Sequence, residues 1–404
     1  MIFTIALRNV FRQKRRTVLT VLTMLGGFAL SAIAIAWSDG SYSYIIDMFA
    51  RNQLGHIQVH GQGYLDRPSL YKVIGDYDEV GAAIERVPGV EFWAPRVFCA
   101  GLAAVGNKSA GVRIIGIDPE RESAATRFDR KVTSGRSFSP SAAGEAVLGE
   151  GLAKTLHAAI GDEVVVVSQA ADGSIANDLY TIVGLVATGS NISDQSALYL
   201  HLHDAQELLV LEGRVHEIAV IGDDLDDVPD LASDIKAALG DNGLAVETWK
   251  EFAKSFYHAM KVDQQGSWIM VVIIVLVVAV GVLNTVLMTV LERTREYGVL
   301  RAIGTAPAQI FRLVLLEVLI MAAIAVVLGA ALSYGVNYAL SIHGITLPVS
   351  FTYGGVVFTK MFTEINARSF YIPGVSVVLS AILISMLPAT KAARVAPARA
   401  MRTH

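Results

Sequence analysis

Two kinds of stretch in this sequence hold residue types that bind phosphate or metal ions in other proteins. The stretch GEGLAKT (149–155) resembles part of a phosphate-binding loop. Such a loop needs a lysine directly after its final glycine so that both reach the phosphates, and here Lys154 lies three residues beyond Gly151. We therefore predict a turn and a helix start at this stretch. No other stretch has the motif, so no ATP site is expected on this chain.

The histidines are candidate metal ligands. His56 and His60 can share one face of a strand, and so can His201 and His203. Neither pair stands in an H-E-x-x-H motif or has cysteine partners. The acidic run DDLDDVPD (223–230) lacks the glycine of a calcium loop and is expected to interact with the N-terminus of the helix that follows. We predict no metal site, no catalytic site and no enzymatic activity.

A charged hairpin, ERTREYGVLRAIGTAPAQIF (292–311), separates two apolar runs. Tyr297, Leu300 and Ile303 recur every three residues, which predicts a short helix with one apolar stripe. A glycine and a proline follow, which is typical of a helix end. The charged residues can pair at i, i+3 on the remaining surface, Glu292 with Arg295 and Arg293 with Glu296.

Two interpretations of this hairpin remain open. It is either a basic loop that only sets membrane topology, or a helix (292–309) that inserts its apolar stripe into a groove of another protein. The stripe favours insertion, and a force applied there would pass directly into the two flanking apolar runs. The residues predicted to couple to the partner are Glu292, Arg293, Arg295, Glu296, Tyr297, Leu300, Arg301, Ile303 and Gly304.

Composition explains what surrounds the hairpin. The chain is 53% hydrophobic and 17% charged, with a mean hydropathy of +0.49, which is too apolar for an ordinary soluble protein. About 20 residues of helix cross a hydrocarbon core of ~30 Å. We predict an α-helical membrane protein with four transmembrane helices, at 17–37, 268–291, 310–340 and 371–388.

Lysine and arginine predict the orientation. They are concentrated in three flanking segments, 1–16, 292–309 and 389–404, and are sparse in the loop 341–370. The basic segments are therefore expected to be cytoplasmic. Segment 1–16 has apolar and basic side chains on opposite faces, which predicts an amphipathic helix in the membrane interface. Cleavage of the first apolar run as a signal peptide, after AIAIAW (32–37), is an alternative; the run is longer than signal peptides usually have.

Polar and small residues within the spans follow a four-residue spacing. Glu317 is expected to face protein and find a basic partner such as Arg312 or another residue near the membrane surface, because an ionised acid in lipid costs roughly 3 kcal/mol or more. The small residues that follow favour packing within the chain, with a dimer contact as the alternative. A proton relay is a further alternative for the acid. The predicted packing and polar positions are Glu317, Ala325, Gly329, Ser333, Asn337 and Asn284.

The long segment 38–267 lies between the first two spans and is predicted to be external. It carries 33 acidic and 18 basic side chains, a formal charge of −15, which argues against nucleic acid as a partner. At each end, the spacing of the apolar residues and the positions of the turn residues predict a β-α-β unit. Between them, about 120–211, strand-like stretches dominate. We predict a large α+β domain with a ferredoxin-type subdomain made from both ends and an inserted β-rich subdomain.

Several of these stretches resemble one family. The hairpin is similar to the coupling-helix signature of the ABC-transporter permeases that include MacB, FtsX, LolC and LolE, and LPATKAARVAPARAMR (387–402) is similar to the end of these permeases. The layout of one span, a large external domain and three spans also fits. LGHIQVHGQGY (54–64) and GRSFSPSAAGEAVLGEGLAKTLHAAIGDEV (135–164) are most similar to the LolC/LolE branch.

This resemblance implies a function. The chain is expected to be the permease of an ATP-driven exporter in the inner membrane, with a porter-like periplasmic domain, that extracts or releases lipoproteins by transmitting motion across the membrane. ATP and magnesium are expected on a separate ATPase dimer. A second permease copy or paralogue, membrane lipid, and a periplasmic lipoprotein carrier or adaptor are the other expected partners. The alternatives are a MacB-like efflux permease with an adaptor and outer-membrane channel, and a signalling permease that controls an external cell-wall hydrolase.

Overall fold

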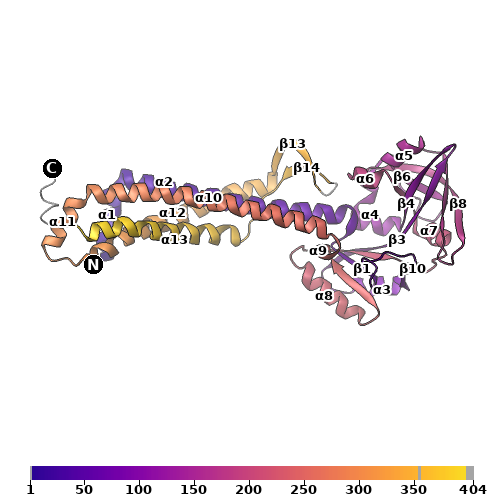
Figure 1. Cartoon of the computed structure of the whole chain (residues 1–404), viewed down its shortest axis with the longest axis horizontal. Coiled ribbons are helices and arrows are strands. Elements are labelled where there is room, and N and C mark those ends of the chain that lie inside the picture. The colour runs from indigo at the N-terminus through magenta and orange to yellow at the C-terminus, as the bar shows by residue number, and fades with distance from the viewer. Residues whose placement is uncertain (1, 354–355, 397–404) are drawn as a thin grey trace. The chain divides into compact units, whose positions relative to one another are not determined.

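The structure consists of two compact units. The computed structural model describes residues 2–353 and 356–396 (Figure 1). The helical unit comprises Met1–Tyr42, Met260–Leu347 and Lys360–His404, and the sheet unit comprises Ser43–Ala259 and Pro348–Thr359.

The helical unit is built from four long apolar helices and two short ones. The predicted four-helix membrane architecture with a large α+β insert is confirmed among the described residues. Each helix is longer than the apolar run that predicted it, because polar residues at the ends continue the helix. The long helices are α2 (Lys14–Phe49), α10 (Lys254–Glu292), α12 (Pro307–His343) and α13 (Arg368–Ala393), and the short ones are α1 (Ile2–Arg12) and α11 (Thr294–Ala302).

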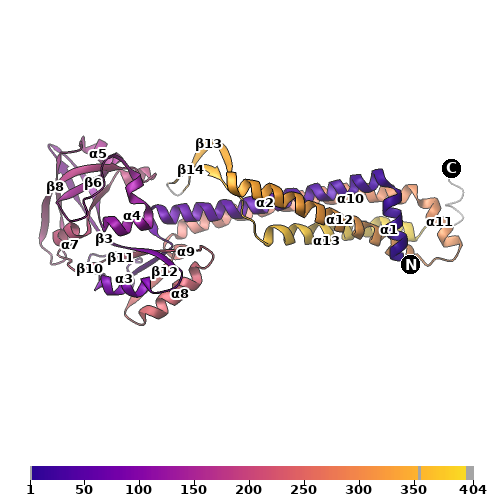
Figure 2. The same cartoon turned by 180° about the vertical axis from the view of Figure 1, so that it is seen from behind.

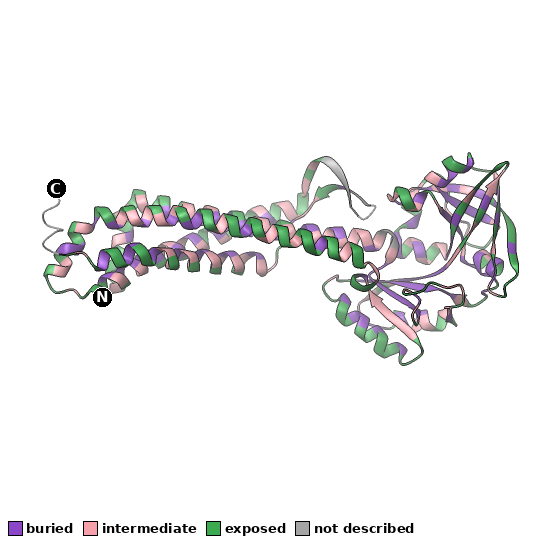
Figure 3. Cartoon of the chain, viewed as in Figure 1, coloured by how far each residue is buried: buried purple, intermediate pink, exposed green. Residues whose placement is uncertain are grey.

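Close packing of α2 on α10 depends on glycine. A Cβ at Gly27 would collide with Val278, and a Cβ at Gly281 would lie 2.9 Å from Thr23 Cγ2. The two helices therefore approach at positions where one partner has no side chain. Behind this seam Phe28 is fully buried in the core of the unit, while the outer faces of the helices stay exposed (Figure 3). Apolar side chains on those outer faces suit a lipid surrounding.

The segment before α13 is held against α2. Glu364 N donates to Ala36 O at 2.9 Å, and Asn366 Nδ2 donates to Asp39 Oδ2 at 3.0 Å. A Cβ at Gly40 would lie 2.5 Å from Glu364 N, so only glycine permits this approach. The loop predicted at 341–370 also contains two strands, β13 (Ile345–Tyr353) and β14 (Val356–Met361).

The two ends of the external segment together form one half of the sheet unit, and this half has the ferredoxin-type arrangement. Strands β1 (Ile57–Gly61) and β3 (Val90–Val105) flank helix α3 (Tyr77–Glu85), and β11 (Glu217–Gly222) and β12 (Leu244–Thr248) flank α8 (Val228–Leu239). Their order, β12-β1-β11-β3, is antiparallel throughout. Two split β-α-β units therefore interleave, as the hydrophobic periods predict.

The β-rich half continues the same sheet. After β3 the order is β4-β9-β6-β8-β5, with β7 paired to both β3 and β8, which makes ten strands among the described residues. Strand β3 joins the two halves because its 16 residues pair with β11 at one end and with β4 and β7 at the other. The strands of this half are β4 (Lys108–Ile117), β5 (Val132–Gly135), β6 (Glu145–Gly149), β7 (Glu163–Gln169), β8 (Ile175–Val186) and β9 (Ala197–His201).

Short helices and turns complete the sheet unit. The phosphate-loop-like stretch forms the end of β6 and the start of helix α5, the turn and helix that its spacing predicts. A small sheet pairs β2 (Ile74–Gly75) with β10 (Arg214–Val215). The remaining elements are the π-helical turn η1 (Ala50–Leu54), the 3-10 turn η2 (Phe128–Lys131), and helices α4 (Pro119–Thr126), α5 (Glu150–Leu156), α6 (Asn191–Asp194), α7 (Leu202–Leu209) and α9 (Trp249–Phe252).

The glycine seam gives a matched pair of substitutions. Gly27→Ala places a methyl group against Val278, and we expect a lower thermal midpoint of the purified chain, because overpacking of this kind costs about 1–3 kcal/mol. Gly26→Ala, one residue earlier, has no atom within 4 Å of the new Cβ and is expected to leave the midpoint unchanged or raise it. Equal midpoints for both variants in detergent would show that α2 and α10 do not pack closely here.

Candidate functional site

Helix α11 begins and ends at defined residues. Gly304 has a φ of +96° and follows the helix, and Thr305 N donates to Leu300 O at 3.0 Å. This hydrogen bond satisfies a carbonyl at the end of the helix, and glycine takes this conformation without strain. Pro307 then starts α12, where its missing N–H costs nothing. The sequence signals therefore set a nine-residue helix between two spans.

A buried ion pair fixes α11 to the next span. The Nη1 atom of Arg293, just before α11, donates to both carboxylate oxygens of Glu317 in α12, at 2.9 and 3.0 Å. Both side chains are less than one-tenth exposed. Asn9 Nδ2 from α1 donates to the same carboxylate at 2.7 Å, and Arg293 Nε donates to Glu296 at 2.8 Å. The acid is thus held by groups from two other segments.

Two further ion pairs connect the N-terminal helices to the same place. Arg12 Nη2 lies 2.6 Å from Glu296 Oε1, and Arg16 of α2 pairs with Glu292 at the end of α10. Burial disfavours the Glu296 carboxylate, but hydrogen bonds and charge from Arg293 and Arg12 outweigh it and lower its pKa. Five helices therefore meet at one charged cluster. Figures 1 and 2 show α1 and α11 at the same end of the helical unit.

The prediction of an outward apolar stripe on α11 is wrong at Tyr297 and Leu300. Tyr297 is fully buried in the core of the helical unit, with the Arg293 guanidinium 5.3 Å from its ring centroid. Leu300 is half-buried against the same core, and only Ile303 is exposed, at 75%. A three-residue spacing drifts by about 60° per step around a helix of 3.6 residues per turn, so the stripe winds from the inner face to the outer one.

A different set of residues forms the exposed face of α11. Val299 is 47% exposed and lies one turn before Ile303, and both are flanked by exposed Arg295 and Ala302. We call these four residues the outward face of α11. Sequence reasoning missed Val299, although its four-residue spacing to Ile303 marks a shared helix face. The outward face is apolar at its centre and is formed by residues that make no part of the charged cluster.

The remaining predicted coupling residues take structural roles. Glu292 pairs with Arg16 and not with Arg295, and Arg301 Nη1 donates to Thr305 O at 3.2 Å. The expected i, i+3 pair of Arg293 with Glu296 is present. Most of the charges in this hairpin therefore hold the helix in place.

The predicted positions within α12 all face the interior. Glu317, Ala325, Gly329, Ser333 and Asn337 are buried. A Cβ at Gly329 would lie 2.8 Å from Phe28 Cδ1, so the small residues admit α2, and packing within the chain accounts for them.

Glu317 has the basic partner that was predicted for it. Of the two alternatives, the residue near the membrane surface is the one found, Arg293, and Arg312 is exposed. One prediction about a polar residue in the spans is wrong. Asn284, predicted as a packing position, is exposed on the surface of α10.

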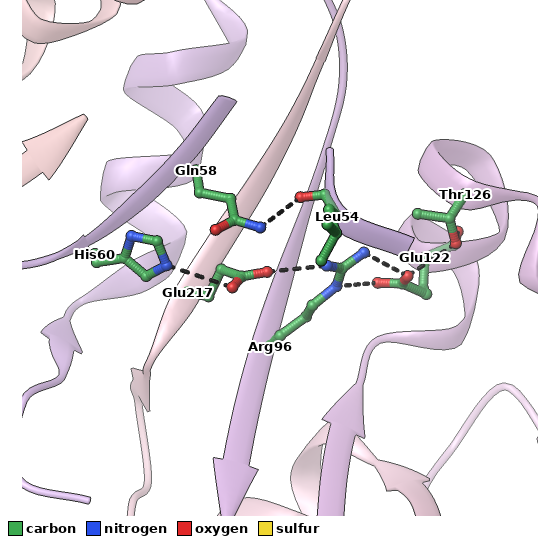
Figure 4. Close-up of polar contacts among 7 residues, drawn as sticks. All are labelled: Leu54, Gln58, His60, Arg96, Glu122, Thr126 and Glu217. Atoms are coloured by element: carbon green, nitrogen blue, oxygen red, sulfur yellow. Dashed lines mark hydrogen bonds and ion pairs between the residues drawn. The ribbon is translucent and has the colours of Figure 1, made fainter. Parts of the chain in front are cut away.

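A second set of buried charges lies in the sheet unit (Figure 4). Arg96 donates to Glu122 at 2.8 and 2.9 Å and to Glu217 at 2.9 Å. Burial disfavours the charged form of Glu217, yet hydrogen bonds from His60 and Arg96 and their charges lower its pKa. His60 also contacts Glu247, so this histidine is held by two carboxylates. His56 accepts a hydrogen bond from Gly222 N.

These histidines contact carboxylates and a backbone amide of neighbouring strands. Within the ranges that the structure covers, no group of three metal-binding side chains comes together.

Long apolar helices around a large α+β insert, with a short charged helix between two of them, define a polytopic membrane permease. Residues 17–238 match the MacB-like periplasmic core domain, and residues 268–397 match the FtsX-like permease C-terminal domain. The chain belongs to the MacB/FtsX family of ABC transporter permeases. Both matched domains are permease domains.

Alignments with named relatives cover from about half to nearly all of this chain. The lipoprotein-releasing system transmembrane protein LolC of Neisseria meningitidis is 26% identical over 78% of this chain and 76% of its own length. The ABC transporter permease YtrF of Bacillus subtilis is 31% identical over 49% of this chain and 45% of its own length. The pyoverdine export ATP-binding/permease protein PvdT of Pseudomonas savastanoi is 25% identical over 99% of this chain, which spans 59% of that relative.

The buried ion pair can be tested by a double-mutant cycle. Glu317→Leu leaves the Arg293 guanidinium buried without its main partner, and we expect a loss of about 3–5 kcal/mol in the free energy of unfolding. Adding Arg293→Met is expected to recover part of that loss, because the orphaned charge is then gone. Thermal and denaturant unfolding of the purified single and double variants measure the coupling. Strictly additive losses would show that the two side chains do not interact.

Proposed function

We propose that this chain is the membrane permease of an ABC transporter, and that a partner ATPase dimer docks on the outward face of α11. The observation that carries the proposal is that α11 has two distinct sides. Its inner side is fixed to the spans through Tyr297 and the Arg293–Glu317 pair, and its outer side presents Val299 and Ile303 to solvent. An exposed apolar patch rimmed by charge fits a protein groove. In this proposal ATP and magnesium bind to the partner ATPase.

The charged cluster makes α11 suited to transmitting force. A displacement of the helix pulls on Glu317 of α12 through a buried ion pair, and on α1 and α2 through Arg12 and Arg16. Helices α2 and α10 each contribute residues to both units of the chain. Motion that begins at the ATPase would therefore continue along these two helices to the sheet unit. The work is done on the far side of the membrane in this mechanism.

The basic flanks support an orientation for the chain. Segments 1–16 and 389–404 and the hairpin carry most of the basic side chains outside the sheet unit. In Figure 1 α1 lies near α11 at one end of the helical unit, and α13 contacts α11. We place that end in the cytoplasm and the sheet unit in the periplasm, with the helices in the inner membrane.

A second permease copy or a paralogue completes the membrane assembly in this proposal. Asn284 lies within the apolar part of α10, and its amide is exposed on the surface of the unit. An amide facing lipid is unfavourable, whereas an amide facing another helix can form a hydrogen bond. The exposed side of α10 at Asn284 is therefore our choice for the contact between permeases.

For the cargo we propose lipoproteins, which this transporter would extract from the inner membrane and pass to a periplasmic carrier. The support is the similarity to LolC relatives over about three quarters of the chain. Depletion of the protein should cause lipoproteins to accumulate in the inner membrane, as fractionation with labelled lipoproteins would detect. Normal lipoprotein sorting in depleted cells would reject this cargo and leave the permease assignment standing.

Docking on α11 predicts a charge-sensitive contact. Ile303→Asp is expected to weaken ATPase binding by orders of magnitude, because burying an unpaired carboxylate in an apolar contact costs several kcal/mol. The matched control is Ile175→Asp, at an isoleucine in β8 that is 79% exposed, compared with 75% for Ile303. Co-purification of the ATPase with each variant, at equal permease level, is the measurement.

One outcome of that experiment would contradict docking on α11. Retention of the ATPase by Ile303→Asp would show that α11 is not the docking helix. Leu300→Asp is a poor substitute for it, because Leu300 packs against the core of its own unit and its loss is expected to destabilise the permease itself.

ATP turnover gives an independent check. The purified chain alone is expected to show no ATP hydrolysis above a blank, since its matched domains are permease domains and its phosphate-loop-like stretch forms α5. Addition of the ATPase subunit should restore turnover. Hydrolysis by the isolated chain would contradict the proposed division of labour.

A further inference from the structure

One face of the sheet unit carries two neighbouring cavities with a shared floor. The smaller has a volume of about 210 Å³ and the larger about 500 Å³. Phe98, Arg113 and Glu217 line both. These residues come from the adjacent strands β3, β4 and β11, where Arg96 pairs with Glu217 and Ala100 with Arg113. Directly paired residues lie on the same face of a sheet, so the cavities are two parts of one groove.

The smaller part of the groove has an excess of positive charge. Its two acids, Glu122 and Glu217, are both engaged by Arg96. Arg113 and Lys131 also line it, so three cationic side chains face two acids among the lining residues. Burial lowers the pKa of Lys131 to about 8, so its amine is still mostly protonated at neutral pH.

Arg113 is positioned for a ligand. Its guanidinium carbon lies 4.7 Å from the centroid of the Phe98 ring, and within the described residues no carboxylate forms an ion pair with it. Stacking on an aromatic ring leaves the N–H groups of the guanidinium at its edge available. Arg113 therefore lies at the junction of the two cavities, and its guanidinium N–H groups are available to donate to a ligand.

The larger part of the groove is mainly apolar and has a fixed wall. Its wall is the loop 64–70, which contributes Leu65, Pro68 and Leu70. Tyr64 stacks on His60 at 5.2 Å between ring centroids and contacts the ring of His216 at 5.7 Å. The Nε2 atom of His216 lies 3.2 Å from Leu70 O and holds the far end of the loop. The cavity is thus formed by anchored residues rather than by a loose loop.

We propose that this groove binds an anionic amphiphile, with the charged headgroup at Arg113 and the smaller cavity and the hydrocarbon chain in the larger one. Cationic donors at one end and apolar walls at the other match the two ends of such a molecule. The larger volume lies within the range of small-molecule sites, about 300–1,000 Å³. Burial raises the pKa of Tyr64, so its phenol remains a hydrogen-bond donor beside the headgroup. This site is independent of the cargo proposed above.

The test uses the full chain in lipid nanodiscs with one thiol in the groove. Cys99 is the only cysteine, so Cys99→Ser with Ala100→Cys leaves a single thiol at a position that lines the larger cavity. The rate of alkylation by iodoacetamide reports whether the groove is occupied. Dodecyl phosphate is the probe, and inorganic phosphate and dodecyl maltoside separate the contribution of the anion from that of the chain.

We expect dodecyl phosphate to slow alkylation at concentrations where the two controls do not. Arg113→Gln should weaken that protection about tenfold, as the loss of a charge-assisted hydrogen bond does. Arg113→Lys should retain part of it. Lys108→Gln, at the start of β4 and outside the lining of both cavities, is the matched control and should behave like the parent chain. Unchanged thermal midpoints and unliganded alkylation rates establish that each variant is folded.

Three results would overturn the proposal. Equal protection by dodecyl maltoside would show that the groove recognises the hydrocarbon chain and not the anionic headgroup. Protection by inorganic phosphate at the same concentration would make the site a simple anion site. Protection by dodecyl phosphate that survives Arg113→Gln unchanged would place the headgroup elsewhere.

Discussion

The ion pair between Arg293 and Glu317 is the constraint on which the helical unit depends. A nine-residue helix is too short to be stable by itself in water, so α11 exists because tertiary contacts hold it. The pair supplies a contact that is strong only while both charges are present, since either one alone would be buried without a partner. It also fixes which side of α11 faces inward, and so decides which residues are left outside.

The same physical device recurs in the sheet unit. Arg96 lies between two carboxylates, and one of these carboxylates also meets His60 (Figure 4). In both units a buried arginine joins elements that are far apart in the sequence. Arginine suits this role because its planar group donates several hydrogen bonds at once and stays charged when buried. Each unit therefore combines a buried arginine–carboxylate group with apolar packing.

The sequence predicts the elements of this protein better than their contacts. Four apolar runs, two β-α-β periods and the helix stop at Gly304 are local signals, and each appears in the structure. The prediction of which side of α11 faces outward is wrong. Residues spaced three apart do not stay on one face of a helix with 3.6 residues per turn, so the spacing does not define the exposed face. The contact of Asn9 with Glu317 joins residues 308 positions apart, and no periodicity within one helix reports on it. The cavities at Arg113 likewise depend on which strands become neighbours.

Strand β3 has a consequence for how the sheet unit moves. Arg96 pairs with Glu217 on one neighbouring strand and with Ile117 on the other, so the two halves of the sheet share a backbone ladder at this residue. A hinge at that point would break hydrogen bonds on both sides of β3. We therefore expect the two halves to move as one body and not to bend about β3. Amide protons along β3 should exchange with solvent in one cooperative event rather than half by half.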